Sequence, residues 1–382
     1  MCKTSIILLA AALPMAVNAA NTEFSYGGFI KFNASYSEYS DGDVDANARI
    51  RDFNIPSQIP TSAGNGESST SFDSDIKTSR FNFKTVTDLP EVGKVTAFIE
   101  LDFIGSGGNE LVSNSYGPRV RHAFIKTGHW TFGQTWSTFM NVGALSESVD
   151  FVGVTEGTVF NRQSMIRYTN GNLQLALENP ETNIAGFGAT DDSGLPDVVV
   201  RYNIKKGPAD IVVAGIARQL ALQVSDADDD ASNGNQSIDE TEIGLGFNVS
   251  GKVMVGKDDI KFSYSGGNIA RYVGLSAAAD AQFIDGEIEA TDVSAWFVAF
   301  RHHWSDKLRS SITYSSLTAD YEDDDLAGFS DTEEATSASI NLMYSPAKPL
   351  TYGIEYRHAT HELTNGNEGD LDRLQFTTVY KF

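Results

Sequence analysis

The chain has 382 residues, of which 41% are hydrophobic and 34 are glycine, and its formal net charge at pH 7 is −23. This composition excludes collagenous and low-complexity sequences, and the acidic balance argues against a nucleic-acid partner. The single cysteine, Cys2, lies at the very start of the chain, so a disulfide-stapled secreted domain is also excluded.

Residues 1–19 have the pattern of a secretory signal peptide. Lys3 precedes an apolar run that begins at Ile6, and the run leads to the small-residue pattern Val17-Asn18-Ala19. The run is shorter than the roughly 20 residues of a spanning helix, so a membrane anchor is the weaker interpretation. We therefore expect a signal peptide at residues 1–19 and one domain over residues 20–382.

No long apolar segment follows, which leaves two classes open: a soluble β protein or an outer-membrane β-barrel. Residues 24–39 have a pattern of period two, with Tyr26, Ile30 and Phe32 on one face and Lys31 and Asn33 on the other. One face suits lipid and the other suits water.

The same succession of a long loop, a strand, a short turn and a strand recurs along the chain. We expect strands at residues 24–39, 75–87, 94–103, 118–127, 130–136, 161–169, 172–178, 197–205, 210–222, 241–250, 259–269, 291–303, 307–318, 335–344, 351–361 and 371–382. A soluble sandwich seldom keeps one face apolar through so many strands. The pattern therefore predicts an all-β, transmembrane antiparallel barrel of about 16 strands, with long extracellular loops and short periplasmic turns.

The last strand supports closure of the barrel. Leu374, Phe376 and Tyr380 share one face, the chain ends on Phe382, and pairing with the first strand would remove the sheet edge. Aromatic residues expected in an interfacial girdle are Tyr26, Trp130, Trp136, Trp296, Trp304, Tyr314, Tyr344, Tyr352 and Tyr356.

The passage between residues 130 and 163 begins as a strand and then becomes a long loop. It carries the acids Glu147, Asp150 and Glu156 among large apolar residues such as Phe139 and Phe151. Loops of this length are usually functional. Because an outward loop would leave these apolar residues in water, we expect loop 3 to fold into the lumen and narrow it.

Basic residues concentrate on the predicted polar face of the strands. By alternation the lumen receives Lys31, Arg80, Lys84, Arg119, Arg121, Arg167, Arg201, Arg218, Arg301, Arg309, Arg357 and Arg373. An arginine that faced lipid would cost roughly 2–4 kcal/mol at the midplane. The face taken by Arg162 is ambiguous, because odd and even positions of a strand face opposite sides and Arg167 on the same short strand is assigned to the lumen. The alternative for each arginine is that it neutralises a wall acid such as Glu100, Asp102, Glu178 or Glu355.

Arg80, Arg119 and Arg121 precede loop 3, so we expect them to face its acids across the constriction. Rings of Arg and Lys favour anions, and a planar guanidinium binds a carboxylate through two hydrogen bonds. The expected anion-binding set is Arg80, Lys84, Arg119, Arg121, Arg162, Arg167, Arg201 and Arg357, with Glu147, Asp150 and Glu156 as constriction-loop acids. The hypothesis is passive, anion-selective diffusion of small solutes, with a dicarboxylate as the best-matched shape.

Acid clusters fall in predicted loops, at residues 226–230, 321–325 and 331–334. They are interpreted as solvated loops, and divalent cations that bridge them to lipopolysaccharide are the sharper alternative. The calcium-loop pattern that begins at Asp226 fails, because Ala231 replaces the required glycine and Ser237 the required glutamate.

Catalytic and metal-binding motifs are absent from the sequence. His358 and His361 take opposite faces of a strand, so no metal site is expected there, and no cofactor is implied. An outer-membrane hydrolase would need a nucleophile beside His122, His302 or His303, and no spacing suggests one. A structural or adhesin-like barrel, or a plugged receptor, stays open.

Several blocks resemble one family: WTFGQTWSTFMNVGALSESVDF, TEGTVFNRQ, IRYTNGN, ALENPET, GGFIKFNASYSEYSDGD, RDFNIPSQIP and NSYGPRVRHAFIKT. They are similar to the DcaP-like trimeric outer-membrane porins, associated with dicarboxylate uptake, whereas the second half matches only in pattern. The resemblance implies a homotrimer in the outer membrane of a Gram-negative bacterium, in contact with lipid and lipopolysaccharide. It transfers Arg119, Arg121, Arg162 and Arg167 as candidate lumen residues and leaves a general, non-specific porin as the alternative.

Overall fold

The computed structural model describes residues 21–106, 108, 111–224, 237–322 and 329–382. The predicted signal peptide, the acid cluster at 226–230 and most of that at 321–325 lie outside these ranges. Sixteen strands form the wall: β1 (Thr22–Tyr39), β3 (Arg80–Leu89), β4 (Gly93–Asp102), β5 (Arg119–Thr127), β6 (Trp130–Trp136), β7 (Arg162–Asn170), β8 (Leu173–Glu178), β11 (Asp197–Lys206), β12 (Ala209–Val224), β13 (Ile238–Val255), β14 (Asp258–Gly267), β17 (Asp292–His303), β18 (Leu308–Asp320), β19 (Thr332–Ala347), β20 (Leu350–Leu363) and β21 (Glu368–Lys381).

Each wall strand pairs antiparallel with the next one in the wall, and β1 pairs with β21 from Phe29↔Lys381 to Tyr39↔Leu371. This pairing closes the barrel and confirms the predicted fold class. One further strand, β2 (Ser69–Asp75), pairs with the second half of β1, while β3 pairs with the first half. No described helix is long and apolar enough to cross a membrane.

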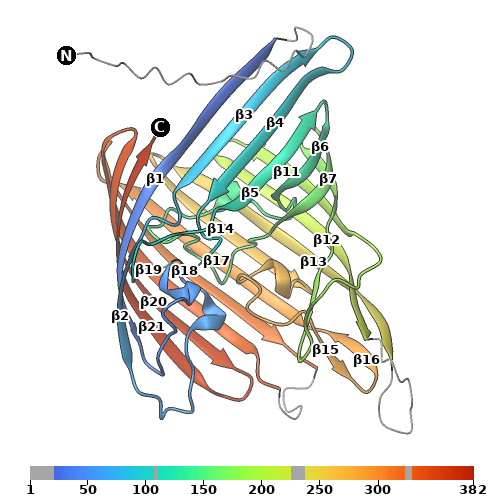
Figure 1. Cartoon of the computed structure of the whole chain (residues 1–382), viewed down its shortest axis with the longest axis vertical. Coiled ribbons are helices and arrows are strands. Elements are labelled where there is room, and N and C mark those ends of the chain that lie inside the picture. Colours follow the sequence, from blue (N-terminus) through green and yellow to red (C-terminus); the bar gives the residue numbers. More distant parts are fainter. Residues whose placement is uncertain (1–20, 107, 109–110, 225–236, 323–328) are drawn as a thin grey trace, which may run out of the picture.

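The two ends of the barrel differ in their connections. Short turns lie at the end where β1 begins and β21 ends, at the top of Figure 1, and long loops lie at the opposite end. We call these the turn end and the loop end. The turns are tight enough to need glycine in the left-handed region, as at Gly171 (φ 57°) and Gly207 (φ 57°).

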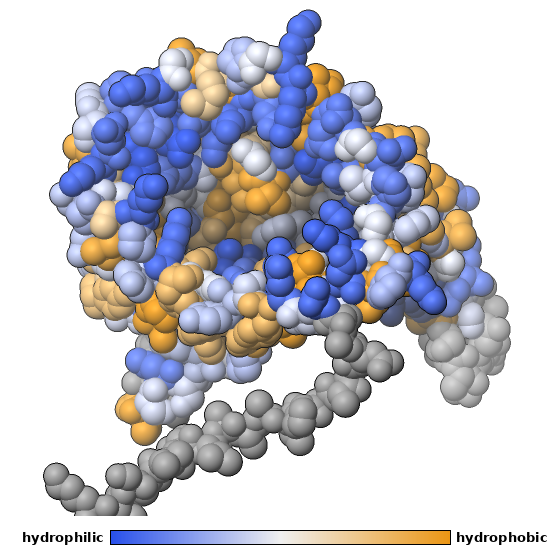
Figure 2. All heavy atoms as spheres, turned by 90° about the horizontal axis from the view of Figure 1, so that it is seen from above, coloured by the Kyte–Doolittle hydropathy of each residue, from blue (hydrophilic) through white to orange (hydrophobic). Residues whose placement is uncertain are grey.

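The two faces of the wall follow the predicted alternation. Outward residues such as Tyr26, Phe132 and Ile340 are exposed, whereas inward polar residues such as Asn33 and Ser315 are buried. Figure 2, a view of the turn end, shows hydrophilic residues around a hollow and hydrophobic residues on the outer flanks and in the depth of the hollow. The inner face of the wall is mostly polar, so the apolar residues deep in the hollow come from segments that fold into the barrel.

Three loop-end segments fold into the barrel. Residues 40–68 include the 3-10 helices η1 (Arg49–Arg51) and η2 (Pro56–Gln58), loop 3 spans 137–161 with η3 (Val142–Ala144), and residues 268–291 contain η5 (Ala270–Tyr272). The last segment also carries β15 (Ala281–Ile284) and β16 (Glu287–Ala290), which form a small sheet with β9 (Thr182–Ile184) and β10 (Gly188–Thr190).

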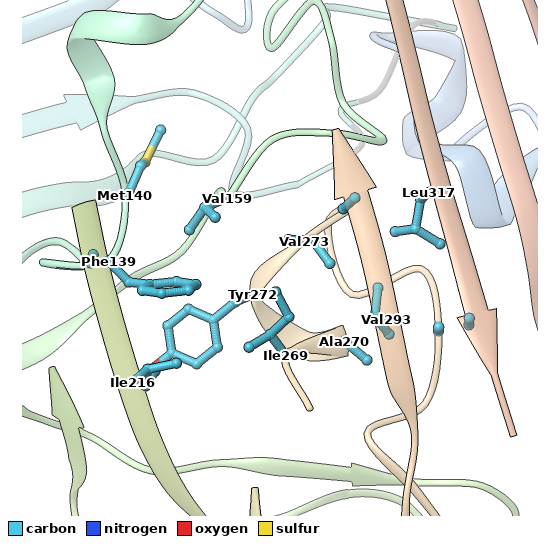
Figure 3. Close-up of a cluster of buried hydrophobic side chains, with 14 of the residues drawn as sticks. Phe139, Met140, Val159, Ile216, Ile269, Ala270, Tyr272, Val273, Val293 and Leu317 are labelled. Carbon is cyan, nitrogen blue, oxygen red and sulfur yellow. The ribbon is translucent and has the colours of Figure 1, made fainter. Parts of the chain in front are cut away.

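Loop 3 and residues 268–280 share one hydrophobic cluster with the inner wall. Figure 3 shows Phe139 and Tyr272 facing each other, with their ring centroids 5.8 Å apart in an edge-to-face arrangement. Ile216 and Val293 of the wall complete the contact. The predicted entry of loop 3 into the lumen is confirmed. Two further segments, 40–68 and 268–291, also bury apolar residues in the barrel, which the sequence pattern did not predict.

Candidate pore constriction

Loop 3 is held by basic side chains that reach its backbone carbonyl oxygens. Their partners are spaced along the loop: Arg167 donates to Trp136 O, Arg201 Nη1 to Met140 O (2.6 Å), Lys261 to Leu145 O and Lys31 Nζ to Val149 O (2.7 Å). A buried carbonyl without a partner would destabilise the loop, and a cationic donor makes the stronger kind of hydrogen bond. These four wall cations therefore seat the loop.

The loop acids bind a different part of the wall from the one expected. Glu147 accepts two hydrogen bonds from Arg309, at 2.7 and 2.6 Å, and one from Arg301 at 3.4 Å. Burial alone raises the pKa of Glu147, but the hydrogen bonds and positive charge of Arg309 and Arg301 outweigh it and hold the pKa below its ordinary value. Glu147 thus fastens the loop to β17 and β18.

Asp150 and Glu156 are buried against residues 40–68. Asp150 accepts a hydrogen bond from Asn54 N (3.0 Å), and Glu156 accepts from Asn54 Nδ2 (2.7 Å) and from Ser337 Oγ (2.7 Å). The expectation that the loop acids face Arg80, Arg119 and Arg121 is wrong. The physical reason is that other partners are nearer: segment 40–68 supplies them for Asp150 and Glu156, and strands β17 and β18 supply them for Glu147.

The backbone of loop 3 also touches the wall directly at Gly157. A Cβ atom there would lie 2.2 Å from the carbonyl carbon and oxygen of Trp296, and Gly157 N donates to Ser315 Oγ at 2.7 Å. Only glycine permits this approach, so the residue fixes the height at which the loop crosses the lumen.

Arginines and aromatic rings alternate on the opposite side of the lumen, at the loop-end tips of β3, β5 and β7. Arg80 and Arg121 both lie over the ring of Phe151, each with its guanidinium carbon 5.6 Å from the centroid. Arg121 also lies 5.5 Å from the ring of Trp136, and Arg162 lies 4.9 Å from it. Cations within about 6 Å of an aromatic face are attracted to it. We call this row the arginine ladder.

Two of the arginines at the ladder are paired and two are not. Arg119 binds Asp102 through two hydrogen bonds (3.0 and 2.7 Å), and Arg121 binds Glu100 (2.8 Å) and Asp102 (3.0 Å). Arg80 and Arg162 form no hydrogen bond or ion pair with any described residue, and Arg80 Nε is buried. Four guanidinium groups therefore share two carboxylates, and positive charge is in excess.

A β-bulge explains the crowding on β5. Glu100 of β4 pairs with His122 and Leu101 pairs with Val120, so Arg121 has no paired residue on β4. Arg121 and His122 are consequently both buried, a change of face that alternation alone does not predict. Arg162 pairs directly with Trp136 across β6 and β7, so both residues have the alternation of the outer face. They lie at the strand tips, where the guanidinium of Arg162 stacks on the ring of Trp136.

Trp136 was expected in the interfacial girdle, and the structure corrects this. Its ring packs edge-to-face on Phe160 of loop 3, with centroids 4.8 Å apart, and it contacts two arginines. The strand ends at Trp136, so the side chain lies over the rim of the barrel. Trp130, in contrast, is exposed on the outer surface.

A cavity of about 580 Å³ adjoins the ladder at the loop end. Its lining includes Arg119, Arg162 and Arg271, the half-buried ring of Phe160, and a single acid, Glu181. Arg271 is held by Asp197 (3.2 Å) beside Tyr272, whose pKa is raised by burial and by the negative charge of Asp197. Sequence reasoning missed Arg271, although the apolar run around it carries the same inward signal as loop 3.

The other predicted residues lie elsewhere in the lumen. Lys84 is exposed on the inner face toward the turn end, and Arg167 and Arg201 hold loop 3 as described. Arg357 is buried between Ser337 (3.0 Å) and Glu355 (3.1 Å) and does not reach open space. Neutralisation of wall acids thus accounts for Arg119, Arg121 and Arg357, and it does not account for Arg80 or Arg162.

Solved structures with a similar fold include an outer-membrane channel and other outer-membrane proteins. The channel DcaP of Acinetobacter baumannii matches with a TM-score of 0.76 and 21% sequence identity, over 94% of this chain and 97% of that one. The loop-deleted OmpT of Vibrio cholerae matches with a TM-score of 0.56 and 14% identity, over 94% and 99% of the two chains. OmpF of Salmonella typhi, in complex with daunomycin, matches with a TM-score of 0.53 and 11% identity, over 93% and 97%.

No curated protein gives a significant match to the chain. The family model of the DcaP outer membrane protein, in contrast, matches residues 11–382, nearly the whole sequence. This match and the porin barrel place the protein in the outer membrane of a Gram-negative bacterium. The chain belongs to the DcaP outer membrane protein family.

Proposed function

We propose that the barrel is a passive, anion-selective channel whose preferred solutes are small dicarboxylates. The observation that carries the proposal is the arginine ladder: four guanidinium groups share two carboxylates, and those of Arg80 and Arg162 have no polar partner among the described residues. An anion at the ladder meets unpaired charge, whereas a cation meets net repulsion.

The geometry also favours an anion with two ends. Arg80 and Arg162 lie at opposite ends of the row, separated by Phe151, Arg121 and Trp136. A guanidinium binds a carboxylate through two parallel hydrogen bonds, so two such groups in series suit a dicarboxylate better than a monovalent ion. The ring of Phe151, between Arg80 and Arg121, has no hydrogen-bonding group, so the solute is held by few polar contacts and is bound weakly enough for release.

The test is the reversal potential of single channels in a potassium chloride gradient, followed by liposome swelling with succinate, a sugar and a diamine of similar size. The expected result is anion preference and fastest swelling with succinate. Arg80→Gln with Arg162→Gln should move the reversal potential toward the cation side. Lys307→Gln with Lys348→Gln, in exposed turns at the opposite end of the barrel, removes the same number of charges; it is the matched control and should not move the reversal potential.

Cation preference of the unaltered channel would overturn the proposal, and equal swelling with all three solutes would favour a general porin. The homotrimer is part of the same proposal. It is checked by the mass of the detergent-solubilised protein, with a monomer as the contrary result.

A further inference from the structure

A second cavity, on the turn side of loop 3, lies apart from the arginine ladder. It measures about 370 Å³, and no residue that lines it also lines the cavity beside the ladder. Asn141 and Gly143 of loop 3 form one wall, and Arg201, Lys205 and Lys252 stand on the barrel side. We call this space the inner pocket.

The basic residues of the inner pocket form an ordered row. Lys205 pairs directly with Asp210, Asp210 with Lys252, and Lys252 with Lys261, on four successive strands from β11 to β14. All four are inward-facing by alternation. Asp210 is the one acid in the row, and its contact with Lys205 is long (3.7 Å) between exposed side chains, so it is weak.

Lys252 and Lys261 are like charges directly opposite each other, an arrangement that destabilises a sheet. Lys261 turns to Leu145 O of loop 3, and Lys252 makes no hydrogen bond or ion pair with any described residue. An anion seated beside Lys252 would relieve the repulsion.

Arg201 is already positioned for such an anion. Nη1 donates to Met140 O at 2.6 Å and Nε donates to Asn203 Oδ1 at 3.0 Å, which fixes the guanidinium plane on the wall of the pocket. Asn203 is held in turn by Asn172 O (3.1 Å). A fixed guanidinium loses little freedom on binding and so binds a carboxylate more effectively than a mobile one.

We propose that the inner pocket is a second binding site for small carboxylates, in series with the arginine ladder and divided from it by loop 3. This inference rests on the proposed function, because it takes the same solutes to the turn side of the constriction. A solute leaving the ladder would be received by Arg201 and Lys252 before it reaches the periplasm, and two weak sites in series speed passage more than one strong site.

The experiment measures how often succinate interrupts the ionic current of single channels when it is added from the turn side or from the loop side. Lys252→Gln should reduce the interruption rate for succinate from the turn side about three- to tenfold, as expected for loss of one partly screened charge. Lys252→Arg should restore most of the rate. The matched control Lys126→Gln removes an inward lysine of β5 at the same end, outside the pocket, and should change the rate by less than about twofold.

Failure of this inference and failure of the proposed function give different results. If Lys252→Gln leaves succinate binding from the turn side unchanged while the channel stays anion-selective, the inner pocket is overturned and the ladder stands. If the unaltered channel prefers cations, the proposed function is overturned. Equal losses with Lys252→Gln and Lys126→Gln would also overturn the inference, because they would show a diffuse electrostatic field and no pocket.

Discussion

The contact between Glu147 and Arg309 allows a quantitative test of how loop 3 is held. Glu147→Gln removes the charge from a pair joined by hydrogen bonds of 2.7 and 2.6 Å, with side chains 22% and 18% exposed. Hydrogen bonds to charged groups contribute about 1.5–3 kcal/mol when well buried. Partial exposure reduces this, so we expect a coupling energy of about 2 kcal/mol, roughly thirtyfold in the equilibrium between attached and detached loop.

The assay is a double-mutant cycle of Glu147→Gln, Arg309→Gln and the double variant, read by amide hydrogen exchange. The informative amides are Val149, which donates to Glu355 (2.9 Å), and Gly157, which donates to Ser315 (2.7 Å). Exchange at Val149 should accelerate about thirtyfold in either single variant and little more in the double variant. Additive effects, with a coupling below about 0.5 kcal/mol, would refute the reasoning.

Three further predictions concern the same loop. Gly157→Ala should lower the stability of loop attachment by about 3 kcal/mol, because the new Cβ would overlap the backbone of Trp296. Thermal unfolding and amide exchange at residues 137–161 measure this loss. Gly194→Ala is the control, because the nearest atom to its new Cβ is 3.8 Å away. Phe151→Ala removes the ring between Arg80 and Arg121, so single-channel conductance should rise while anion preference keeps its sign; an unchanged conductance would contradict the placement of this ring. The third prediction follows from the lowered pKa of Glu147: its contribution to loop attachment is present above the ordinary glutamate pKa of about 4.3 and is lost as the pH falls through the lower, folded-state value. Exchange at the Val149 amide, corrected for the intrinsic rate, should therefore not change between pH 7 and pH 5. An increase in that window would contradict the ion pair.

Much of the wall could be predicted from sequence because alternation is a local signal. Lys31, Arg218 and Arg373 occupy the predicted inner face, and all sixteen expected strands are present with boundaries that differ by a few residues. Apolar content also sufficed to send loop 3 inward, since Phe139 and Val149 had to be buried.

The partners of the candidate site could not be predicted in the same way, because they come from segments distant in sequence. Asp150 and Glu156 meet Asn54 from a segment about a hundred residues earlier, and Glu147 meets Arg309 from far later in the chain. The β-bulge at Arg121 was missed because one extra residue leaves no trace in an alternating pattern. Trp136 was assigned to the girdle by residue type, whereas its place at the strand tip decides its contacts.

The anchors of loop 3 come from Lys31 on β1, Arg167 on β7, Lys261 on β14 and Arg309 on β18, which are spread around the whole circumference. The complete set of anchors exists only when these distant strands stand around one lumen. Full attachment of loop 3 therefore requires the closed barrel, and the narrowing of the lumen depends on strands that the loop itself does not join.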